Sequence, residues 1–550
     1  MKLQIPLHLF KGLKLEKRDL LDIARRTQQP HVEVGHQFLS QQDHATLLEA
    51  CQKQEQPSKE VNKLKRQLRS LIEIQADPLL NKIKSVGALK EALLLCLRQL
   101  PHGWVFRFNK ELQHWLPYVV EGVNEETGGR YSTPHVRLTL IAWRLGQRKE
   151  VTVDLYNRDL RGKNLSQILD ASGIRLETEE LWREHHQHQE TYEKFHSQTG
   201  DQFVVNGWVQ TSDSENSWKP EAYRLPEDVD LPGLVVMDHL HNLKDDEPER
   251  IADVSQWHEE GKEVEMPLHP LVYAYDLVGH VEVIAHITDL KPHQYQNDID
   301  RYLVIPQETR KLLNVLRQAL RLQDRDVISG KAGGCLILLK GDPGLGKTLT
   351  AQVFAEQNRR PLYELQCSQL GISPPEVEEN LRDALLRARR WNAVLLINEA
   401  DVFVRARGGD IVQNAIVGVF LRLLENLTGV CFLTTNMGTT IDDAVNSRAL
   451  VHLEYRYPDA KQRAELFRIQ SAIQKVDAPE TTYERFAQKH NLSGRDIRQL
   501  VKLVNLLALQ RGKAVSQEDL DWALRWRQKP KLENREMQTS GRSEQAPTSV

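Results

Sequence analysis

The chain has 550 residues, more than one hydrophobic core usually holds, so its length predicts several domains. Hydrophobic residues make up 40% and charged residues 27%, as in ordinary globular proteins, and the formal net charge is -3. This near balance of charge argues against a chain whose partner is chosen by overall charge, such as nucleic acid or an acidic surface.

The positions of the cysteines and the lengths of the apolar runs further narrow the class of protein. The five cysteines are scattered without a CxxC pair, so they indicate neither a disulfide framework nor a zinc site. No apolar run approaches the roughly 18 residues that a membrane-spanning helix needs. The N-terminal stretch lacks the apolar core and cleavage site of a signal peptide. We therefore expect a cytoplasmic protein with no membrane partner.

Residues 1–130 are predicted to form a mainly helical N-terminal region. In the stretch 60–74 apolar residues recur at helical spacing, namely Val61, Leu64, Leu68 and Leu71. Basic residues lie between them: Lys63, Lys65, Arg66 and Arg69. A solvated helix face and a nucleic-acid-binding patch both fit this pattern, so nucleic acid stays open as a partner.

Residues 131–300 are predicted to be a mixed α/β region that binds a client or another partner. Residues 134–155 and 271–290 each alternate apolar and polar side chains around a glycine, Gly146 and Gly279, which predicts two hairpins. The histidine-rich stretch 182–196 fits an exposed helix, with a metal site as the alternative. Residues 211–262 are polar and acidic, and the stretch 242–250 in particular is predicted to be a surface connection.

The strongest signal is a phosphate-binding loop between an apolar run and a helical segment. After Cys335–Leu339 the chain fills the pattern G-x-x-x-x-G-K-T with Gly341, Asp342, Pro343, Gly344, Leu345, Gly346, Lys347 and Thr348. Glycines let backbone amides approach the phosphates of ATP, and the following helix directs its positive end towards them. Lys347 supplies charge to the outer phosphates, and the Thr348 hydroxyl is a candidate Mg2+ ligand.

A second apolar run, Ala393–Ile397, ends in Asn398 and Glu399. In phosphate-loop enzymes the first position normally holds magnesium, often through water, and the next acid polarises the attacking water. Glu399 is therefore a candidate catalytic residue. Asn398 stands where an aspartate is expected, keeping one carbonyl acceptor but removing a negative charge beside the metal. Two outcomes stay open: slow hydrolysis, or an ATP-binding switch with negligible turnover.

A third strand, Val430–Asn436, ends in an asparagine at the same predicted edge of the sheet. Together with the segments 360–371, 391–403, 420–436 and 441–455, this order resembles the AAA family of oligomeric ATPases. The resemblance covers residues 301–528, and it is strongest to a group of poorly characterised bacterial and fungal AAA proteins. It implies an α/β core with a parallel sheet over 301–457 and a helical lid over 458–528.

The resemblance also assigns roles to individual residues. Asn436 corresponds to sensor 1, and Arg448 to the arginine finger that reaches the ATP of a neighbouring subunit. Arg495 corresponds to sensor 2 of the lid, although Arg498 could serve equally well. A homo-oligomer follows, with a hexameric ring as one form. The family's pore loop usually carries an aromatic residue, whereas this chain has Leu370, which makes threading of a polypeptide doubtful.

The final residues, 529–550, have almost nothing to bury and are predicted to be a disordered tail. Taken together, the sequence predicts an ATPase that uses ATP and Mg2+ to remodel an unidentified protein client. The alternatives are a non-catalytic oligomeric scaffold and, with less support, a nucleic-acid remodelling factor.

Overall fold

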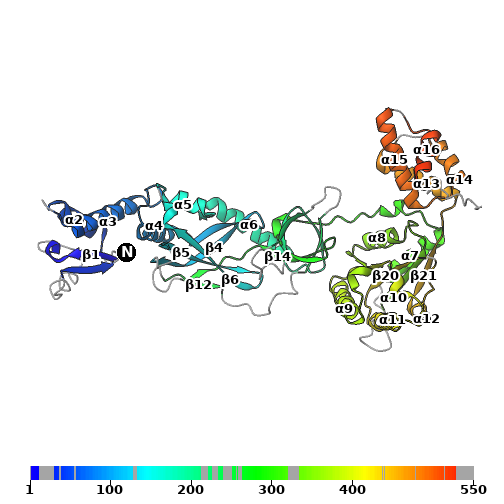
Figure 1. Ribbon diagram of the computed structural model, residues 1–550, viewed down its shortest axis with the longest axis horizontal. Helices are drawn as coiled ribbons and strands as arrows, with labels where there is room; N and C mark the ends of the chain where they lie inside the picture. Colours follow the sequence, from blue (N-terminus) through cyan, green and yellow to red (C-terminus); the bar gives the residue numbers. More distant parts are fainter. Residues whose placement is uncertain are drawn as a thin grey trace, which may run out of the picture. The chain divides into compact units, whose positions relative to one another are not determined.

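The computed structural model divides the chain into two compact units, Met1–His293 and Gln294–Val550 (Figure 1). It describes residues 2–10, 30–35, 39–54, 57–127, 133–160, 162–211, 221–225, 233–238, 250–255, 257, 263–319, 334–436, 438, 440–476, 479–512 and 514–527. The predicted disordered tail, 529–550, lies outside these residues. No helix within these ranges is both long and apolar enough to cross a bilayer.

The first unit begins with a pair of antiparallel strands that shares a core with two helices. Strands β1 (Lys2–Pro6) and β2 (His31–Gly35) pair antiparallel, the 3-10 helix η1 spans Leu7–Phe10, and helices α2 (Gln41–Gln52) and α3 (Lys59–Ala76) follow. Serine side chains cap the first turn of both α-helices. The apolar stripe predicted on α3 is buried in this core, which confirms its helical spacing.

A five-stranded antiparallel sheet of order β6-β5-β4-β3-β7 comes next. Its strands are Trp104–Asn109 (β3), His114–Glu126 (β4), His135–Arg144 (β5), Gln147–Tyr156 (β6) and Ile174–Leu176 (β7), and the nearby helices are Val86–Gln99 (α4), Asn157–Leu160 (η3) and Leu165–Ala171 (α5). The predicted hairpin around Gly146 is confirmed as β5 and β6. The strands β3 and β4 lie in the region predicted to be mainly helical. They were not predicted because the apolar centre of β4 does not alternate.

A seven-stranded antiparallel sheet of order β10-β9-β15-β14-β11-β8-β16 completes the first unit, and a short pair β12-β13 packs in the core of the five-stranded sheet. The strands are Gln202–Val205 (β8), Gly207–Thr211 (β9), Ala222–Leu225 (β10), Gly233–Met237 (β11), Ile251–Asp253 (β12), Glu263–Glu265 (β13), Leu271–Asp276 (β14), Val281–His286 (β15) and Leu290–Pro292 (β16), with the 3-10 helix η6 at Ile287–Asp289. The second predicted hairpin is confirmed as β14 and β15. Strand β11 lies inside this sheet although it belongs to the polar segment 211–262. Of the predicted surface connection 242–250, residues 242–249 lie outside the described ranges.

The histidine-rich stretch forms helix α6 (Glu179–Phe195), as predicted, but one of its histidines faces the core. His185 is 4% exposed and packs edge-on against Trp104, and burial lowers the pKa of its imidazole to about 3. Within the described part of the chain, no three histidine, cysteine or acidic side chains are grouped so that they could hold a metal ion.

The second unit contains a parallel sheet of order β18-β19-β20-β17-β21 flanked by helices (Figure 1). Its strands are Cys335–Gly341 (β17), Leu362–Gln366 (β18), Val394–Asn398 (β19), Val430–Thr435 (β20) and Val451–Tyr455 (β21). The helices are Ile299–Tyr302 (η7), Gln307–Ala319 (α7), Lys347–Asn358 (α8), Cys367–Leu370 (η8), Pro374–Arg390 (α9), Asp401–Val404 (α10), Ile411–Leu424 (α11) and Asp443–Arg448 (α12). The central strands β19 and β20 are buried along their whole length, as their unbroken apolar runs predict.

Four helices follow the sheet: Ala460–Gln474 (α13), Glu480–Lys489 (α14), Gly494–Arg511 (α15) and Gln517–Arg527 (α16). An apolar stripe of α15 is buried at Ile497, Leu500, Val501 and Val504, where it meets Phe467 and Phe486. At the start of α16, Ser516 and Asp519 exchange hydrogen bonds in a capping arrangement. These helices have their own core and form a lid-like subdomain.

Candidate nucleotide site

The loop between β17 and α8 has a backbone that requires glycine at two positions. Gly344 and Gly346 have φ values of 84° and 100°, in the left-handed region that side chains with a Cβ disfavour. Gly346 caps helix α8, so the helix N-terminus opens directly onto the loop. Backbone amides and a helix N-terminus facing one loop form a binding site for anions such as phosphate.

Lys347 and Thr348 occupy the first turn of α8. The Lys347 ammonium donates to the backbone carbonyls of Gly341 and Asp342, and burial lowers the pKa of this lysine, against the raising effect of Asp401. The Thr348 hydroxyl donates to Oδ1 of Asn398 at 3.2 Å. The structure thus brings together the loop and the end of β19, which are fifty positions apart in sequence.

Asn398 ends β19 with three side-chain contacts. Its Oδ1 accepts from Thr348 and, at 3.1 Å, from Thr434 of β20, while its Nδ2 donates to the carboxylate of Glu364 on β18. The side chain is 7% exposed. Oxygen atoms of a hydroxyl, an amide and a carboxylate therefore lie at one edge of the sheet, and such hard oxygens suit Mg2+.

Glu399 has an exposed side chain and a φ of 54°, a left-handed backbone that costs about 1–3 kcal/mol for a residue other than glycine. Its backbone N–H donates to the Thr434 hydroxyl at 2.9 Å, which holds this turn against β20. Non-glycine residues in strained turns cluster at functional sites. The turn directs the Glu399 side chain away from the sheet, whereas the apolar residues of the strand before it are buried.

Asn436 follows β20 and is held by a carboxylate that the sequence analysis did not identify. Asp401 accepts from the backbone N–H and the side-chain amide of Asn436, both at 2.9 Å, and from the Thr435 hydroxyl at 2.7 Å. Three contacts from one carboxylate fix the orientation of the asparagine. A local signal was available, since Asp401 lies two residues after Glu399, but its partner could be known only from the fold.

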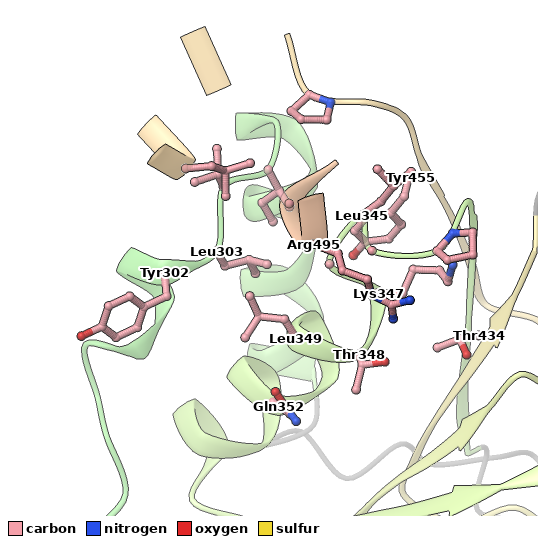
Figure 2. Close-up of a pocket in the computed structure, with 18 of the residues that line it drawn as sticks. Tyr302, Leu303, Leu345, Lys347, Thr348, Leu349, Gln352, Thr434, Tyr455 and Arg495 are labelled. Carbon is pink, nitrogen blue, oxygen red and sulfur yellow. The ribbon is translucent and has the colours of Figure 1, made fainter. Parts of the chain in front are cut away.

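The lid contacts the phosphate loop through the first turn of α15. The Arg495 backbone N–H donates to the Gly344 carbonyl at 3.1 Å, and a Cβ on Gly344 would lie 2.6 Å from the Arg495 Cβ. The positive charge of Arg495 also lowers the pKa of Lys347, although less than burial does. Figure 2 shows Arg495 of the lid beside Lys347 of the loop.

One cavity of about 1030 Å³ connects these groups. The predicted site residues that line it are Pro343, Gly344, Leu345, Gly346, Lys347, Thr348, Asn398, Glu399, Asn436 and Arg495, and Arg498 lines it too. The cavity extends to Tyr302, Leu303 and Ile305, which the sequence analysis missed (Figure 2). Their apolar run before α7 was the available signal. Polar groups at one end and apolar groups at the other suit a molecule such as a nucleotide.

Comparison with known proteins identifies this part of the chain. Residues 337–457 match the model of the ATPase family associated with various cellular activities (AAA). The chain contains an AAA domain. The parallel sheet with its phosphate loop and the separate group of lid helices agree with the fold that the sequence predicts.

Several curated proteins are similar to the region around the AAA domain. The ATP-dependent zinc metalloprotease FtsH 3 of Sphaerobacter thermophilus is 27% identical over 42% of this chain and 50% of its own length. The proteasome regulatory subunit homolog MJ1494 of Methanocaldococcus jannaschii is 26% identical over 34% of this chain and 54% of its own length. The chain thus spans about half the length of these relatives. The uncharacterized AAA family ATPase y4kL of Sinorhizobium fredii is 25% identical over 43% of this chain and 72% of its own length.

Among solved structures, the AAA domain of FIGL-1 in complex with ADP is similar at 19% identity and a TM-score of 0.35. That match covers 42% of this chain and 86% of the other.

Four predicted residues of the AAA domain do not line the cavity: Gly341 and Asp342, whose backbone carbonyls accept from Lys347, and Arg448 and Leu370. Arg448, at the end of α12, is not among the residues that line it; its guanidinium donates to the Ala444 carbonyl at 3.1 Å and pairs with Glu425. Leu370, at the place of the pore-loop aromatic, is 1% exposed, whereas Ile372 is 86% exposed. Within one chain, therefore, Arg448 does not contact the site, and Leu370 is a core residue.

Proposed function

We propose that this chain is an ATP hydrolase that assembles into a homo-oligomer and uses ATP turnover to remodel a protein client. One observation carries the proposal: the phosphate loop, the ends of β19 and β20, and the lid meet around a single cavity. The same arrangement supports closure of the lid on nucleotide through Arg495. In this proposal Met1–His293 binds the client, and 301–457 and 458–528 remain the proposed limits of the AAA core and its lid. A limit at residue 130 would separate β4 from β5, which pair in one sheet, so 1–130 and 131–300 are not proposed as separate domains.

The residues present fit a magnesium nucleotide. Thr348 and Asn398 would hold the cation directly or through water, and the metal would neutralise charge on the phosphates. Lys347 and the loop amides bind the phosphates, while Glu399 takes the proton of the attacking water. Asn436 orients that water, and Arg448 acts from the adjacent subunit. Positive groups placed where charge develops lower the barrier.

Phosphate release by the purified chain with Mg2+ and ATP tests the proposal. We expect turnover that stops on addition of a chelator and falls by about a hundredfold or more in Glu399→Gln, because general-base catalysis contributes that much. The variant should keep its affinity for ATP. Wild-type release no higher than that of Glu399→Gln would contradict hydrolysis.

A non-catalytic oligomeric scaffold is the second candidate, and Asn398 favours it because the amide brings no charge to the metal site. Mass in solution, measured with and without ATP and Mg2+ in the sample used for phosphate release, separates the two candidates. Assembly on ATP without phosphate release supports the scaffold. Assembly with release supports the motor.

A nucleic-acid remodelling factor remains the third candidate. On α3, Lys63, Arg66 and Arg69 are exposed, as either interpretation of the basic helix requires. Tight, salt-sensitive binding of DNA or RNA that is lost on neutralising these residues would favour this function. Unchanged binding of nucleic acid by the neutralised variant would indicate that these basic residues form a solvated face of α3.

A further inference from the structure

The orientation of the Asn398 amide follows from its partners. The two hydroxyls of Thr348 and Thr434 can donate or accept, but an ionised Glu364 carboxylate can only accept. The NH2 group must therefore face Glu364, and Oδ1 must face the two threonines, as the contacts have it. The carbonyl oxygen is thereby presented to Thr348, and a carboxylate lies directly behind the amide.

The pairing of β18 and β19 explains why Glu364 can reach Asn398. In this parallel pair Glu364 is opposite Leu396 and Gln366 is opposite Asn398. Since side chains two positions apart share a face, Glu364 and Asn398 are diagonal neighbours on the same face of the sheet. An extended glutamate spans that diagonal, whereas an aspartate at 364 would be one methylene shorter.

The charge of this pair equals the charge expected of an aspartate at 398. Glu364 contributes one negative charge and Asn398 none, and both line the cavity that contains Thr348 and Lys347. If Asp replaced Asn398, two carboxylates would lie within hydrogen-bonding distance, and each would disfavour ionisation of the other. An asparagine at position 398 therefore avoids this repulsion, and Glu364 provides the negative charge that Asn398 lacks.

The environment of Glu364 is partly desolvated. Its carboxylate accepts from the Asn398 amide and, at 3.3 Å, from the Gln366 amide. A half-buried carboxylate at the edge of a phosphate-binding cavity is thus poised to interact with bound charge.

We propose that Glu364 supplies the negative charge of the magnesium site, with Asn398 linking it to Thr348. The inference rests on the proposed ATP function and goes beyond it by assigning the charge to a residue on another strand. Glu364 acts on the waters of the metal or through the Asn398 amide, and is therefore a positioning residue. Asn398 in turn is part of a working metal site.

Glu364→Gln separates charge from structure, because the glutamine carbonyl can still accept from the Asn398 amide. The measurement is binding of a fluorescent ATP analogue during Mg2+ titration of the full chain, with affinity in chelator as the check on folding. We expect the Mg2+ concentration for half-maximal binding to rise about ten- to a hundredfold, as for other groups that support metal ligands. Glu379→Gln, on the exposed face of α9, is the matched control and should not change it.

The double variant Glu364→Gln with Asn398→Asp returns the charge to position 398 and keeps a hydrogen-bonded amide–carboxylate pair. We expect it to restore the Mg2+ dependence to within about threefold of wild type, since net charge and pairing are conserved. A Glu364→Gln titration within twofold of wild type would overturn the inference, as would a double variant no better than Glu364→Gln. A wild-type chain that binds no nucleotide would instead overturn the proposed function, and this inference with it.

Discussion

At the scale of single residues, Asp401 has the most contacts to the predicted sensor. We expect Asp401→Asn to slow phosphate release about ten- to a hundredfold, because small misplacements of a positioning group cost that much, with little change in ATP affinity. Steady-state kinetics measure the rate of phosphate release, and equilibrium binding measures the affinity for ATP. Asp443→Asn, an exposed aspartate in the first turn of α12, is the control. Equal losses in both variants would contradict a specific role for Asp401.

The two loop glycines differ in what a side chain would meet. In Gly344→Ala the new Cβ would lie 2.6 Å from the Arg495 Cβ, whereas in Gly346→Ala it would meet nothing within 4 Å. Both carry a backbone penalty of about 1–2 kcal/mol. We therefore expect Gly344→Ala to weaken ATP binding more than Gly346→Ala and to lower the melting temperature further. Titration with ATP and thermal unfolding check this order, and equal effects of the two substitutions would contradict a role for the lid contact.

At the scale of elements, the N-terminus of α15 connects lid stability to the nucleotide site. Ser493 and Asp496 form a capping box, and Arg495, which lies between them, donates its backbone N–H to the Gly344 carbonyl. Ser493→Ala should cost about 1 kcal/mol in the free energy of unfolding, as lost N-caps do, and should also weaken ATP binding. Ser516→Ala removes the corresponding cap of α16, whose residues do not line the cavity. It should cost similar stability with unchanged ATP affinity; equal effects on affinity would contradict the coupling.

The same cap predicts a pH dependence. Burial alone raises the pKa of Asp496, but hydrogen bonds from Ser493 and Arg527 outweigh it and hold the pKa below its ordinary value. A lowered folded-state pKa stabilises the fold above the unfolded value, about 3.9, and this contribution is lost as pH falls through the folded value. The difference in unfolding free energy between wild type and Asp496→Asn should be constant near neutrality and vanish under more acidic conditions. A difference independent of pH would contradict this role.

The elements that the sequence predicted best are those with short-range signals. Glycine spacing located the loop before α8, and alternation around Gly146 and Gly279 located two hairpins. Strand β11 was missed because its partners β8 and β14 are distant in sequence and its flanks are polar. Strand β4 was missed because its apolar centre resembles a buried helix segment.

Within the site, motif residues were predictable and their supporting residues were not. Lys347 follows from the spacing of the loop motif, and Asn398 and Glu399 follow from their place at the end of an apolar run. The contact between Glu364 and Asn398 depends on the register of two parallel strands, and no spacing in the sequence specifies that register. The left-handed turn at Glu399 likewise depends on Thr434, which belongs to another strand.

At the scale of the whole molecule, the site is proposed to need a second chain. Arg448→Ala should abolish phosphate release while ATP binding persists, because the finger acts on the neighbour's ATP. Arg422→Ala is the control, since Arg422 is also exposed and paired with a glutamate. A finger acting within its own subunit would require Arg448 to leave Glu425 and reach the cavity, which it does not line.

Mixing two inactive variants tests this arrangement directly. An equal mixture of Arg448→Ala and Glu399→Gln chains contains interfaces that join an intact Glu399 to a neighbour's intact Arg448. Random assembly into a ring with one site per interface makes about a quarter of the interfaces complete. We therefore expect the mixture to recover about a quarter of wild-type phosphate release, although each variant alone has almost none. No recovery in a mixture shown by its mass to be assembled would contradict action in trans and place the role of Arg448 within its own subunit.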